Sequence, residues 1–420
     1  MIVIGNIIGS ILGGVQSQVF GRKVTLLTSV VLFSSGMSFI RFGNHYALLL
    51  VGQLLMGVSS SYVACTVPSY TSEISQSKMR KLSGTFFTPF FAFGSTLMFL
   101  FTAIFNVRTS MIIILVMASL NFVLILFCPK SPSWLFSKGR EQDAFEVLKK
   151  IRGSEEVAKE ELERLKENKK KQTISVENIE RGNKKKWRML NRIAQSSFLK
   201  PFFLLLSLYL FGLQLSGATT LPIYFIPLLK KTGVVTVFDP YWAAAALNIW
   251  RVFVNIITIL IASRVKRRSL LMFSGLICAV GWCMTGLSTY FYENEYFEDY
   301  SEMLPWFTYA SFGVIITGYA SGFVMVLFML LGELLPSNLR GLGTGIILCF
   351  SNTTWFIVVF LFPKILLALS TGGTFFVMSG MTFFVIIVSY FFVPETFGKT
   401  LENIESHYRN RKGLDENKAV

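Results

Sequence analysis

Long apolar runs alternate with short polar connections along most of the 420-residue chain. A bilayer core about 30 Å thick requires roughly 20 apolar residues per helix, which is close to the length of each run. The pattern predicts eleven membrane-spanning helices, near residues 2–20, 24–43, 47–69, 84–106, 109–128, 199–229, 243–263, 269–291, 306–332, 342–362 and 372–393. We therefore expect an all-α membrane protein.

One long polar segment separates the fifth of these spans from the sixth. Its first part, GREQDAFEVLKKIRG at 139–153, places Phe145, Leu148 and Ile151 at helical spacing between charged residues. Such spacing is typical of an amphipathic helix. We expect short amphipathic helices here, followed by a flexible basic linker to about residue 186. The alternative is a linker that is disordered throughout.

Composition and charge agree with a membrane protein. Hydrophobic residues make up 52% of the chain and charged residues 15%, whereas soluble domains contain about 25% charged residues. The net charge of +16 raises the alternative of nucleic-acid binding, but 34 of the 40 lysines and arginines lie in alternate connections. Residues 290–303, YFYENEYFEDYSEM, contain none. An excess of lysine and arginine marks the cytoplasmic side. We therefore expect a multi-pass plasma-membrane protein with a cytoplasmic C-terminus and no nucleic-acid partner.

Residues that carry metal or nucleophilic chemistry are sparse. The five cysteines lie in or at the ends of predicted spans without CxxC spacing, and the two histidines, His45 and His407, lie in connections. The sequence shows neither a grouping of Ser, His and Asp nor a metal-ligand cluster. We expect cysteines that serve packing, no metal, no cofactor and no enzyme activity.

The chain contains two related halves. Glu73 and Arg80 follow the third span, and Glu333 and Arg340 repeat this spacing 260 residues later. The motifs PKSPSW and PETFGK end the two halves. Repeated halves are typical of transporters, whose substrate site lies near the membrane midplane. The repeat predicts an N-terminal bundle at 1–128, a cytoplasmic loop at 129–198, a C-terminal bundle at 199–393 and a cytoplasmic tail at 394–420.

The two halves differ in register at their beginnings. In the later half the basic turn VKRR follows two predicted spans, whereas in the first half the corresponding turn FGRK follows one. We therefore expect that the first of twelve helices is missing from this sequence, and that the 420-residue chain alone is unstable or inactive. The first span present carries Gly5, Gly9 and Gly13 at four-residue spacing, which predicts a face for close helix packing.

One span interrupts its apolar pattern with hydrogen-bonding groups. The stretch LFGLQLSGATTLPIY at 210–224 combines Gln214, Ser216, Thr219 and Thr220 with glycines and a proline. Glutamine both donates and accepts hydrogen bonds, and glycine and proline let a helix unwind where it lines a cavity. The stretch predicts part of a central polar cavity. The alternative is ordinary hydrogen bonding between helices.

Six motifs in this order resemble the sugar porter family of the major facilitator superfamily, over essentially the whole chain. They are FGRK, VPSYTSEISQSKMR, PKSPSWLFSKGR, GLQLSG, GELLPSNLRGLGTG and PETFGKTLENIE. The resemblance includes insect members such as facilitated trehalose transporters. It implies two helical bundles, with eleven of the twelve family helices present, and alternating-access transport of a hexose or a disaccharide such as trehalose. Proton-coupled members of the family carry an acidic residue on their first helix, the helix that we expect to be missing from this sequence. We expect facilitative transport by a monomer.

The resemblance also implies substrate-binding residues. Gln214 matches the second glutamine of the family pair, and Asn352 matches the sugar-binding asparagine of the eleventh family helix. We expect these two amides to line one cavity, facing each other across the interface between the bundles. Other matched positions carry Thr88, Thr219, Tyr224, Arg251 and Phe328. Several amide ligands are therefore replaced, and the alternative function is a non-transporting sugar sensor or an inactive truncated homologue. For Arg251 two placements are open, in the cavity or extended outward beside Trp250.

Finally, the resemblance implies a cytoplasmic gate of charged residues. In the family, Arg and Glu side chains at helix ends bridge the bundles when the protein is open outward, and separate when it opens inward. The matching residues are Arg22, Glu73, Arg80, Arg268, Glu333, Arg340 and Glu395. Lys130 and Ser133 stand where the family motif has Glu and Arg. The alternative is that these charges only obey the positive-inside rule.

Overall fold

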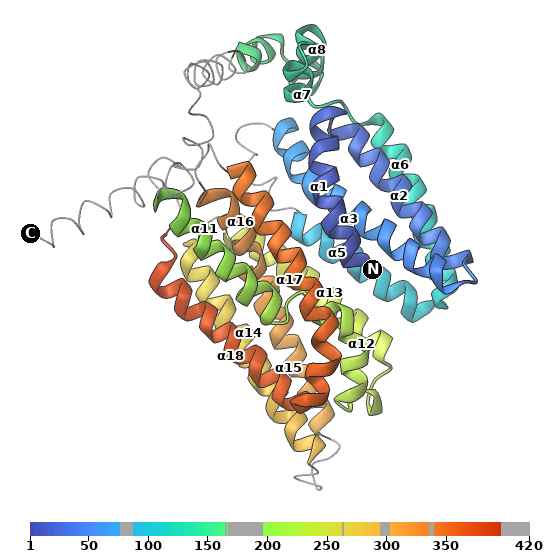
Figure 1. Cartoon of the computed structure of the whole chain (residues 1–420), viewed down its shortest axis with the longest axis vertical. Helices are drawn as coiled ribbons and strands as arrows, with labels where there is room; N and C mark the ends of the chain where they lie inside the picture. The colour runs from blue at the N-terminus through green and yellow to red at the C-terminus, as the bar shows by residue number, and fades with distance from the viewer. Residues whose placement is uncertain are drawn as a thin grey trace, which may run out of the picture. The chain divides into compact units, whose positions relative to one another are not determined.

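The computed structural model describes residues 1–75, 87–163, 166, 196–262, 264–294, 303–335 and 340–395. In these ranges every regular element is a helix (Figure 1). Nine described helices are long and apolar enough to cross a membrane, and two shorter apolar helices, Pro89–Ile104 and Leu199–Leu215, occupy the other two predicted segments. The all-α membrane class is confirmed. The number of helices that cross the membrane stays a prediction.

Contacts divide the chain into two compact units. The first contains Met1–Phe87 and Met111–Ala194, and the second contains Thr88–Ser110 and Gln195–Val420. The helix at 87–104 therefore belongs by its contacts to the second unit, although it lies within the N-terminal bundle that the repeat predicts. The predicted domain boundaries follow the repeat and stay a prediction.

The first unit is built on four long helices, one of them only in part, and a small helical extension. Its helices are α1 (Ile2–Val19), α2 (Arg22–Phe42), α3 (Tyr46–Ile74), most of α6 (Val107–Phe127), α7 (Pro132–Ser137) and α8 (Glu141–Arg152). Helix α1 packs on α3 so closely that a Cβ atom at Gly5 would lie 2.2 Å from the Leu54 carbonyl oxygen, and one at Gly9 would lie 2.7 Å from Val58 Cα. The predicted small-residue face is confirmed.

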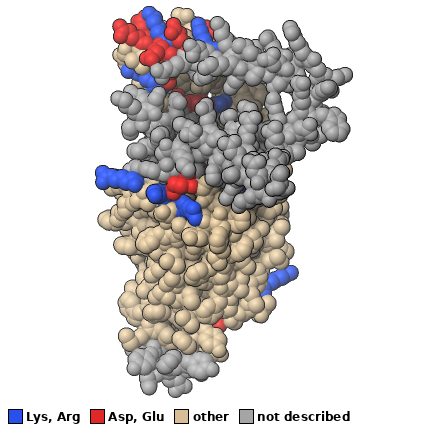
Figure 2. All heavy atoms as spheres, turned by 90° about the vertical axis from the view of Figure 1, so that its left-hand side faces the viewer, with Lys and Arg blue, Asp and Glu red and all other residues tan. Residues whose placement is uncertain are grey.

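Helices α7 and α8 lie beyond one end of α1, α2 and α3 (Figure 1), where charged side chains gather (Figure 2). Ser131 caps α7, because its Oγ accepts from the Trp134 N–H at 3.1 Å. Leu135, Phe136 and Ala144 form a small core between the two helices. The amphipathic helix predicted within 139–153 is confirmed.

The second unit contains the remaining helices. They are α5 (Phe87–Ile104), α11 (Ser196–Tyr209), η1 (Leu210–Leu215), α12 (Leu221–Lys231), η2 (Val234–Thr236), α13 (Pro240–Ala262), α14 (Arg267–Glu293), α15 (Leu304–Gly318), η4 (Tyr319–Phe323), α16 (Val324–Glu333), α17 (Arg340–Ala368) and α18 (Ser370–Phe392). Helix α14 packs against both α15 and α18. Trp282 of α14 stacks on Phe375 of α18 with ring centroids 5.4 Å apart, so an aromatic core holds these helices together.

Two of the long apolar segments in this unit are broken by π-helical turns. The turn η1 interrupts 199–229 and the turn η4 interrupts 306–332. Gly217, just after η1, has φ +83°, and Gly322, inside η4, has φ +135°. Only glycine adopts such angles without strain. The bend predicted from the glycines and prolines of the first segment is confirmed, and the second break is a finding of the structure.

Candidate functional site

Gln214 lies on the π-helical turn η1 and is 3% exposed. Its Nε2 donates to Ser351 Oγ at 2.8 Å and to the Ser351 carbonyl oxygen at 3.2 Å, on helix α17. The backbone takes a left-handed conformation at Gly217, and Thr219 Oγ1 donates to Gln214 Oε1 at 2.7 Å. Both ends of the amide are therefore held by neighbouring residues, which joins η1 to α17.

Asn352 follows Ser351 on α17 and is half-buried. Within the part of the chain that the structure describes, its amide makes no hydrogen bond, so it can still bind another molecule. Gln214 and Asn352 both belong to the second unit. The expectation that they face each other across an interface between bundles is wrong, because Gln214 bonds directly to the residue beside Asn352. That they line one cavity stays a prediction.

The contact between residues 214–224 and α17, which we call the seam, begins with the Gln214–Ser351 hydrogen bond and continues at Tyr224. Tyr224 Oη donates to the Val359 carbonyl oxygen at 2.9 Å, and its ring lies 4.8 Å from that of Phe362. Thr220 lies in sequence between Gln214 and Tyr224, and Trp355 lies between their partners on α17. The Thr220 hydroxyl and the Trp355 indole nitrogen are buried, and neither has a hydrogen-bond partner among the described residues. Buried polar groups are normally paired, so these two groups are candidates to bind a water or a substrate hydroxyl.

The two π-helical turns are joined by a hydrogen bond that the sequence does not predict. Tyr319, the first residue of η4, donates through Oη to the Ser216 carbonyl oxygen at 2.5 Å. The same hydroxyl accepts from Trp282 Nε1 at 2.9 Å. A sequence signal exists: both breaks contain a glycine followed closely by Ser-Gly, as GLQLSG and GYASG.

Helix α13 carries a polar face of which the sequence analysis identified only Arg251. Asn248 is buried and its carbonyl oxygen accepts from Thr96 Oγ1 of α5 at 3.0 Å. Asn255, about two helical turns further along α13, is also buried and donates to the Arg251 carbonyl oxygen at 3.0 Å. The Arg251 guanidinium lies 5.9 Å from the ring centroid of Phe91, also on α5. Spacings of three and four residues within an apolar helix were the available signal.

Two predicted ligands remain: Phe328 packs on the residue that precedes η1, and the side chain of Thr88 is not described. Trp250 marks one of the two expected placements of Arg251 and is not itself a predicted ligand. Trp250 donates from Nε1 to Thr317 Oγ1 at 2.8 Å, so it turns toward α15. Phe328 is 45% exposed and packs edge-to-face on Tyr209, with ring centroids 5.8 Å apart. The side chain of Thr88 lies outside the described residues.

Two residues of the predicted gate meet in the first unit. Arg22 Nη2 lies 2.9 Å from Glu73 Oε1, and the two side chains are 19% and 16% exposed. Arg22 also donates from Nη1 to the Ser17 carbonyl oxygen at 2.9 Å. The Ser131 hydroxyl donates to the other Glu73 oxygen. The carboxylate is thus shared between an arginine and a serine, and the sequence analysis did not identify that serine.

Arg152, at the end of α8, binds the same end of α3. It donates to the carbonyl oxygen of Ile74 at 2.7 Å and to that of Ser75 at 3.2 Å, groups that a helix end leaves unpaired. Its guanidinium also pairs with Glu161 at 2.7 Å and is 4% exposed. Arg152 therefore attaches the amphipathic extension to the helix end that carries Glu73.

In the second unit the predicted gate residues act on helix ends. Glu395 accepts from the backbone N–H of Arg267 at 3.0 Å and from that of Arg268 at 3.3 Å. A carboxylate at a helix N-terminus, here that of α14, is favourable. The Arg268 side chain donates to the Tyr390 carbonyl oxygen and lies 5.2 Å from that ring's centroid.

Three other gate predictions concern parts that the structure does not describe. Arg80 lies outside the described residues, as do the side chains of Glu333 and Arg340. Among the residues that are described, no group of three His, Cys, Asp or Glu side chains is placed to hold a metal ion.

Comparisons with known proteins agree on one family. The profile described as sugar (and other) transporter matches residues 1–408. The chain is 27% identical to the facilitated trehalose transporter Tret1 of Aedes aegypti, over 97% of this chain and 49% of that protein. It is 27% identical to Tret1 of Polypedilum vanderplanki, over 97% of this chain and 78% of that protein. The chain thus spans about half the length of the first relative and about three quarters of the second.

Solved structures are similar in fold. The proton:xylose symporter XylE bound to 6-bromo-6-deoxy-D-glucose matches with a TM-score of 0.73 at 20% identity, over 97% of this chain and 87% of that one. The inward-open conformation of the xylose transporter XylE from E. coli matches with a TM-score of 0.75 at 19% identity, over 96% and 87%. The fold is therefore that of the major facilitator superfamily.

Proposed function

The chain belongs to the sugar (and other) transporter family, and on this basis we propose that it moves a sugar across the plasma membrane by alternating access. The single observation that carries the proposal is the seam between η1 and α17. There the buried amide of Gln214 is bonded beside Asn352, whose own amide is unpaired among the described residues. Transport is facilitative, the chain acts as a monomer and its C-terminus is cytoplasmic.

The chemistry of this seam suits a neutral, hydroxyl-rich substrate. An amide donates and accepts at once, as a sugar hydroxyl does. Near Gln214 and Asn352 in sequence, the hydroxyl of Thr220 and the indole N–H of Trp355 are buried, and both are without a partner among the described residues. A buried charge would be costly to desolvate, and the polar groups of the seam are neutral. A hexose or a disaccharide is the proposed substrate, with trehalose favoured because two curated relatives are named as trehalose transporters.

Alternating access requires that helices bend and that charged helix ends form and break contacts. The breaks at η1 and η4 supply two bends, and breaks of this kind occur in transporter helices near the substrate. The Arg22–Glu73 pair and the Glu395 cap lie at helix ends. We assign them to the gate at the cytoplasmic side, together with Arg80, Glu333 and Arg340.

Uptake of radiolabelled trehalose and glucose into liposomes that contain the purified chain tests the proposal. Gln214→Ala and Asn352→Ala are expected to reduce uptake. Thr353→Ala is the matched control, because Thr353 is exposed and its hydroxyl bonds within its own helix to the Cys349 carbonyl oxygen at 2.9 Å. Uptake that is the same in all four proteins would contradict the proposed site.

A non-transporting sugar sensor is the second candidate function. One observation favours it: both ends of the Gln214 amide are already bonded, to Ser351 and Thr219. The amide then has fewer donors and acceptors available to keep a hydrogen bond to a sugar that moves through the protein. A sensor would bind sugar in an equilibrium assay without accumulating it in vesicles. Binding together with saturable uptake would exclude this function.

A further inference from the structure

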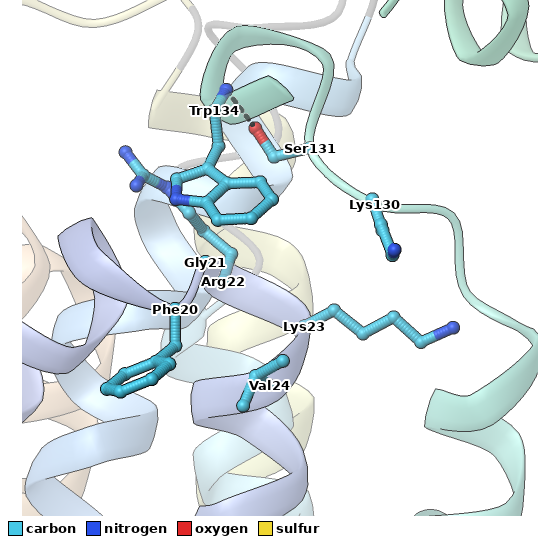
Figure 3. Close-up of a pocket in the computed structure, with 8 residues that line it drawn as sticks. All are labelled: Phe20, Gly21, Arg22, Lys23, Val24, Lys130, Ser131 and Trp134. Atoms are coloured by element: carbon cyan, nitrogen blue, oxygen red, sulfur yellow. Dashed lines mark hydrogen bonds between the residues drawn. The ribbon is translucent and has the colours of Figure 1, made fainter. Parts of the chain in front are cut away.

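A cavity of about 100 Å³ lies in the first unit, where the turn between α1 and α2 faces the segment that leads into α7 (Figure 3). Its lining includes Arg22 and Lys23 from the turn, and Lys130, Ser131 and Trp134 from the segment. This cavity belongs to the unit that does not contain Gln214. It therefore needs an account that is separate from sugar binding.

The aromatic wall of the cavity is rigidly built. Gly21 has φ +92°, and a Cβ atom there would lie 2.9 Å from Trp134 Cε2, so only glycine admits the indole ring at this position. Trp134 Nε1 donates to the Gln18 carbonyl oxygen at 3.0 Å, and the Trp134 N–H donates to Ser131 Oγ at 3.1 Å. Ring and backbone are therefore both held in place.

The positive charge of the cavity is only partly compensated. Arg22 is paired with Glu73 at 2.9 Å. Lys23 donates one hydrogen bond, of 2.7 Å, to the Leu126 carbonyl oxygen, which leaves two of its three N–H groups available. Lys130 is exposed and makes no hydrogen bond or ion pair to the described residues. Both lysine side chains extend to the same side of the Trp134 ring (Figure 3). Two positive charges that line one cavity repel each other, and an anion bound between them would offset that repulsion.

We propose that this cavity binds a phosphate-bearing anion through Lys23 and Lys130, with the headgroup of an anionic phospholipid as its source. Lysine is a common point-charge ligand of phosphate. The cavity lies at the start of α2 and just after the end of α6, two helices long enough to cross a membrane. Basic pockets between such helices bind lipid headgroups, and tryptophan is enriched at that depth. Lys130 takes the place of a Glu in the sugar porter motif, so the site is a property of this chain.

Lipid binding to the full-length chain in neutral detergent tests the proposal by native mass spectrometry. The probes are phosphatidic acid, phosphatidylcholine and inorganic phosphate. Phosphatidic acid is expected to bind more tightly than phosphatidylcholine. Lys130→Glu is expected to weaken phosphatidic acid binding by about fivefold or more, because one lysine near an anionic surface contributes about that factor. Lys138→Glu is the matched control, since Lys138 is exposed and does not line the cavity.

Each outcome decides the proposal. Binding of inorganic phosphate that is lost in Lys130→Glu, together with equal binding of the two lipids, retains the anion site but overturns the phospholipid as its source. Preferred binding of phosphatidic acid that is lost in Lys130→Glu supports the lipid headgroup. Equal binding of the two lipids without binding of phosphate overturns the whole proposal, as does an equal effect of Lys130→Glu and Lys138→Glu. Should Lys130→Glu fail to fold, Lys130→Gln removes the charge with little change in size and is read in the same way. Sugar uptake is not a readout here, so failure of this site leaves the proposed transport untouched.

Discussion

The hydroxyl of Tyr319 donates a 2.5 Å hydrogen bond to the carbonyl oxygen of Ser216, which lies 103 residues earlier in the chain. Each residue sits at a break in a long apolar segment, Ser216 just after η1 and Tyr319 at the start of η4. A carbonyl that an unwound helix leaves unpaired is thus paired by the neighbouring break. The two bends are mechanically linked, and Trp282 holds the link by donating to the same hydroxyl.

Tyr319→Phe removes this link and tests it. The change leaves the Ser216 carbonyl and the Trp282 N–H without their partner, which costs about 1–3 kcal/mol for each buried polar group left unpaired. We expect a lower thermal unfolding temperature in detergent and an altered transport rate in vesicles. Tyr309→Phe is the control, because Tyr309 lies on the adjoining helix α15 and its hydroxyl donates to the Ala243 carbonyl oxygen at 3.1 Å, away from both breaks. If the two variants change transport equally, the link has no role in transport.

Gln214→Ala is expected to weaken sugar binding by about 1–3 kcal/mol, the range for leaving a buried polar group unpaired. Ser351→Ala removes the hydroxyl that accepts from Gln214 Nε2 at 2.8 Å and is expected to weaken binding less. Isothermal titration with the proposed sugar measures both. In a double-mutant cycle the two effects are not additive if the amide and hydroxyl act together. Additive effects would separate them, and unchanged affinity in both would remove the seam from the site.

Glu73→Gln keeps the shape of the side chain and removes its charge. The change weakens the pair with Arg22, which is partly buried at 2.9 Å. It also gives the Ser131 hydroxyl, which donates to the Glu73 carboxylate, a weaker acceptor. We expect slower exchange of sugar across vesicles with nearly unchanged equilibrium binding, since a gate acts on the rate of conversion between states. Glu156→Gln, at an exposed position of the polar segment, is the control. Wild-type exchange in Glu73→Gln would rule out a gating role for this residue.

Arg152→Ala is expected to release α8 from the end of α3. The side chain is 4% exposed and satisfies two backbone carbonyls, those of Ile74 and Ser75. Its loss leaves these groups and Glu161 without partners, so amide hydrogen exchange in 141–152 should rise. Arg140→Ala breaks only an exposed pair with Asp143, and such pairs contribute about 0–1 kcal/mol. Equal protection in both variants would show that other contacts hold α8.

Hydropathy locates the helices of this protein because the bilayer sets a minimum length for each apolar run. The same physics explains why the break at Gly217 was predictable: glycines and a proline stand together with polar side chains inside an apolar run. The break at Gly322 follows the same rule with fewer polar residues, and so it was missed. Family motifs located Gln214, but they did not predict that its amide bonds to Ser351.

Contacts between distant segments are what the sequence analysis did not reach. Tyr319 and Arg152 have no local pattern that names their partners, because a backbone carbonyl is present at every residue and only the fold selects one. Asn248 was equally hidden, since its partner Thr96 lies on α5, a helix that the repeat assigns to the other bundle. Such residues are found only when the packing of helices is known.

The packing of α1 on α3 predicts that replacing a glycine by alanine lowers the stability of the protein at one position of α1 and raises it at another. A Cβ atom at Gly9 would lie 2.7 Å from Val58 Cα, whereas one at Gly14 would meet nothing within 4 Å. Gly9→Ala must therefore push the helices apart, at a cost of about 1–3 kcal/mol as for other overpacked sites. Gly14→Ala adds a methyl group in open space and restricts the unfolded chain, which stabilises by about 0.4–1 kcal/mol. Thermal unfolding of both variants in the same detergent measures the difference. A fall for Gly9→Ala with no fall for Gly14→Ala is the expected result, and equal shifts would mean that α1 does not pack on α3 through this face.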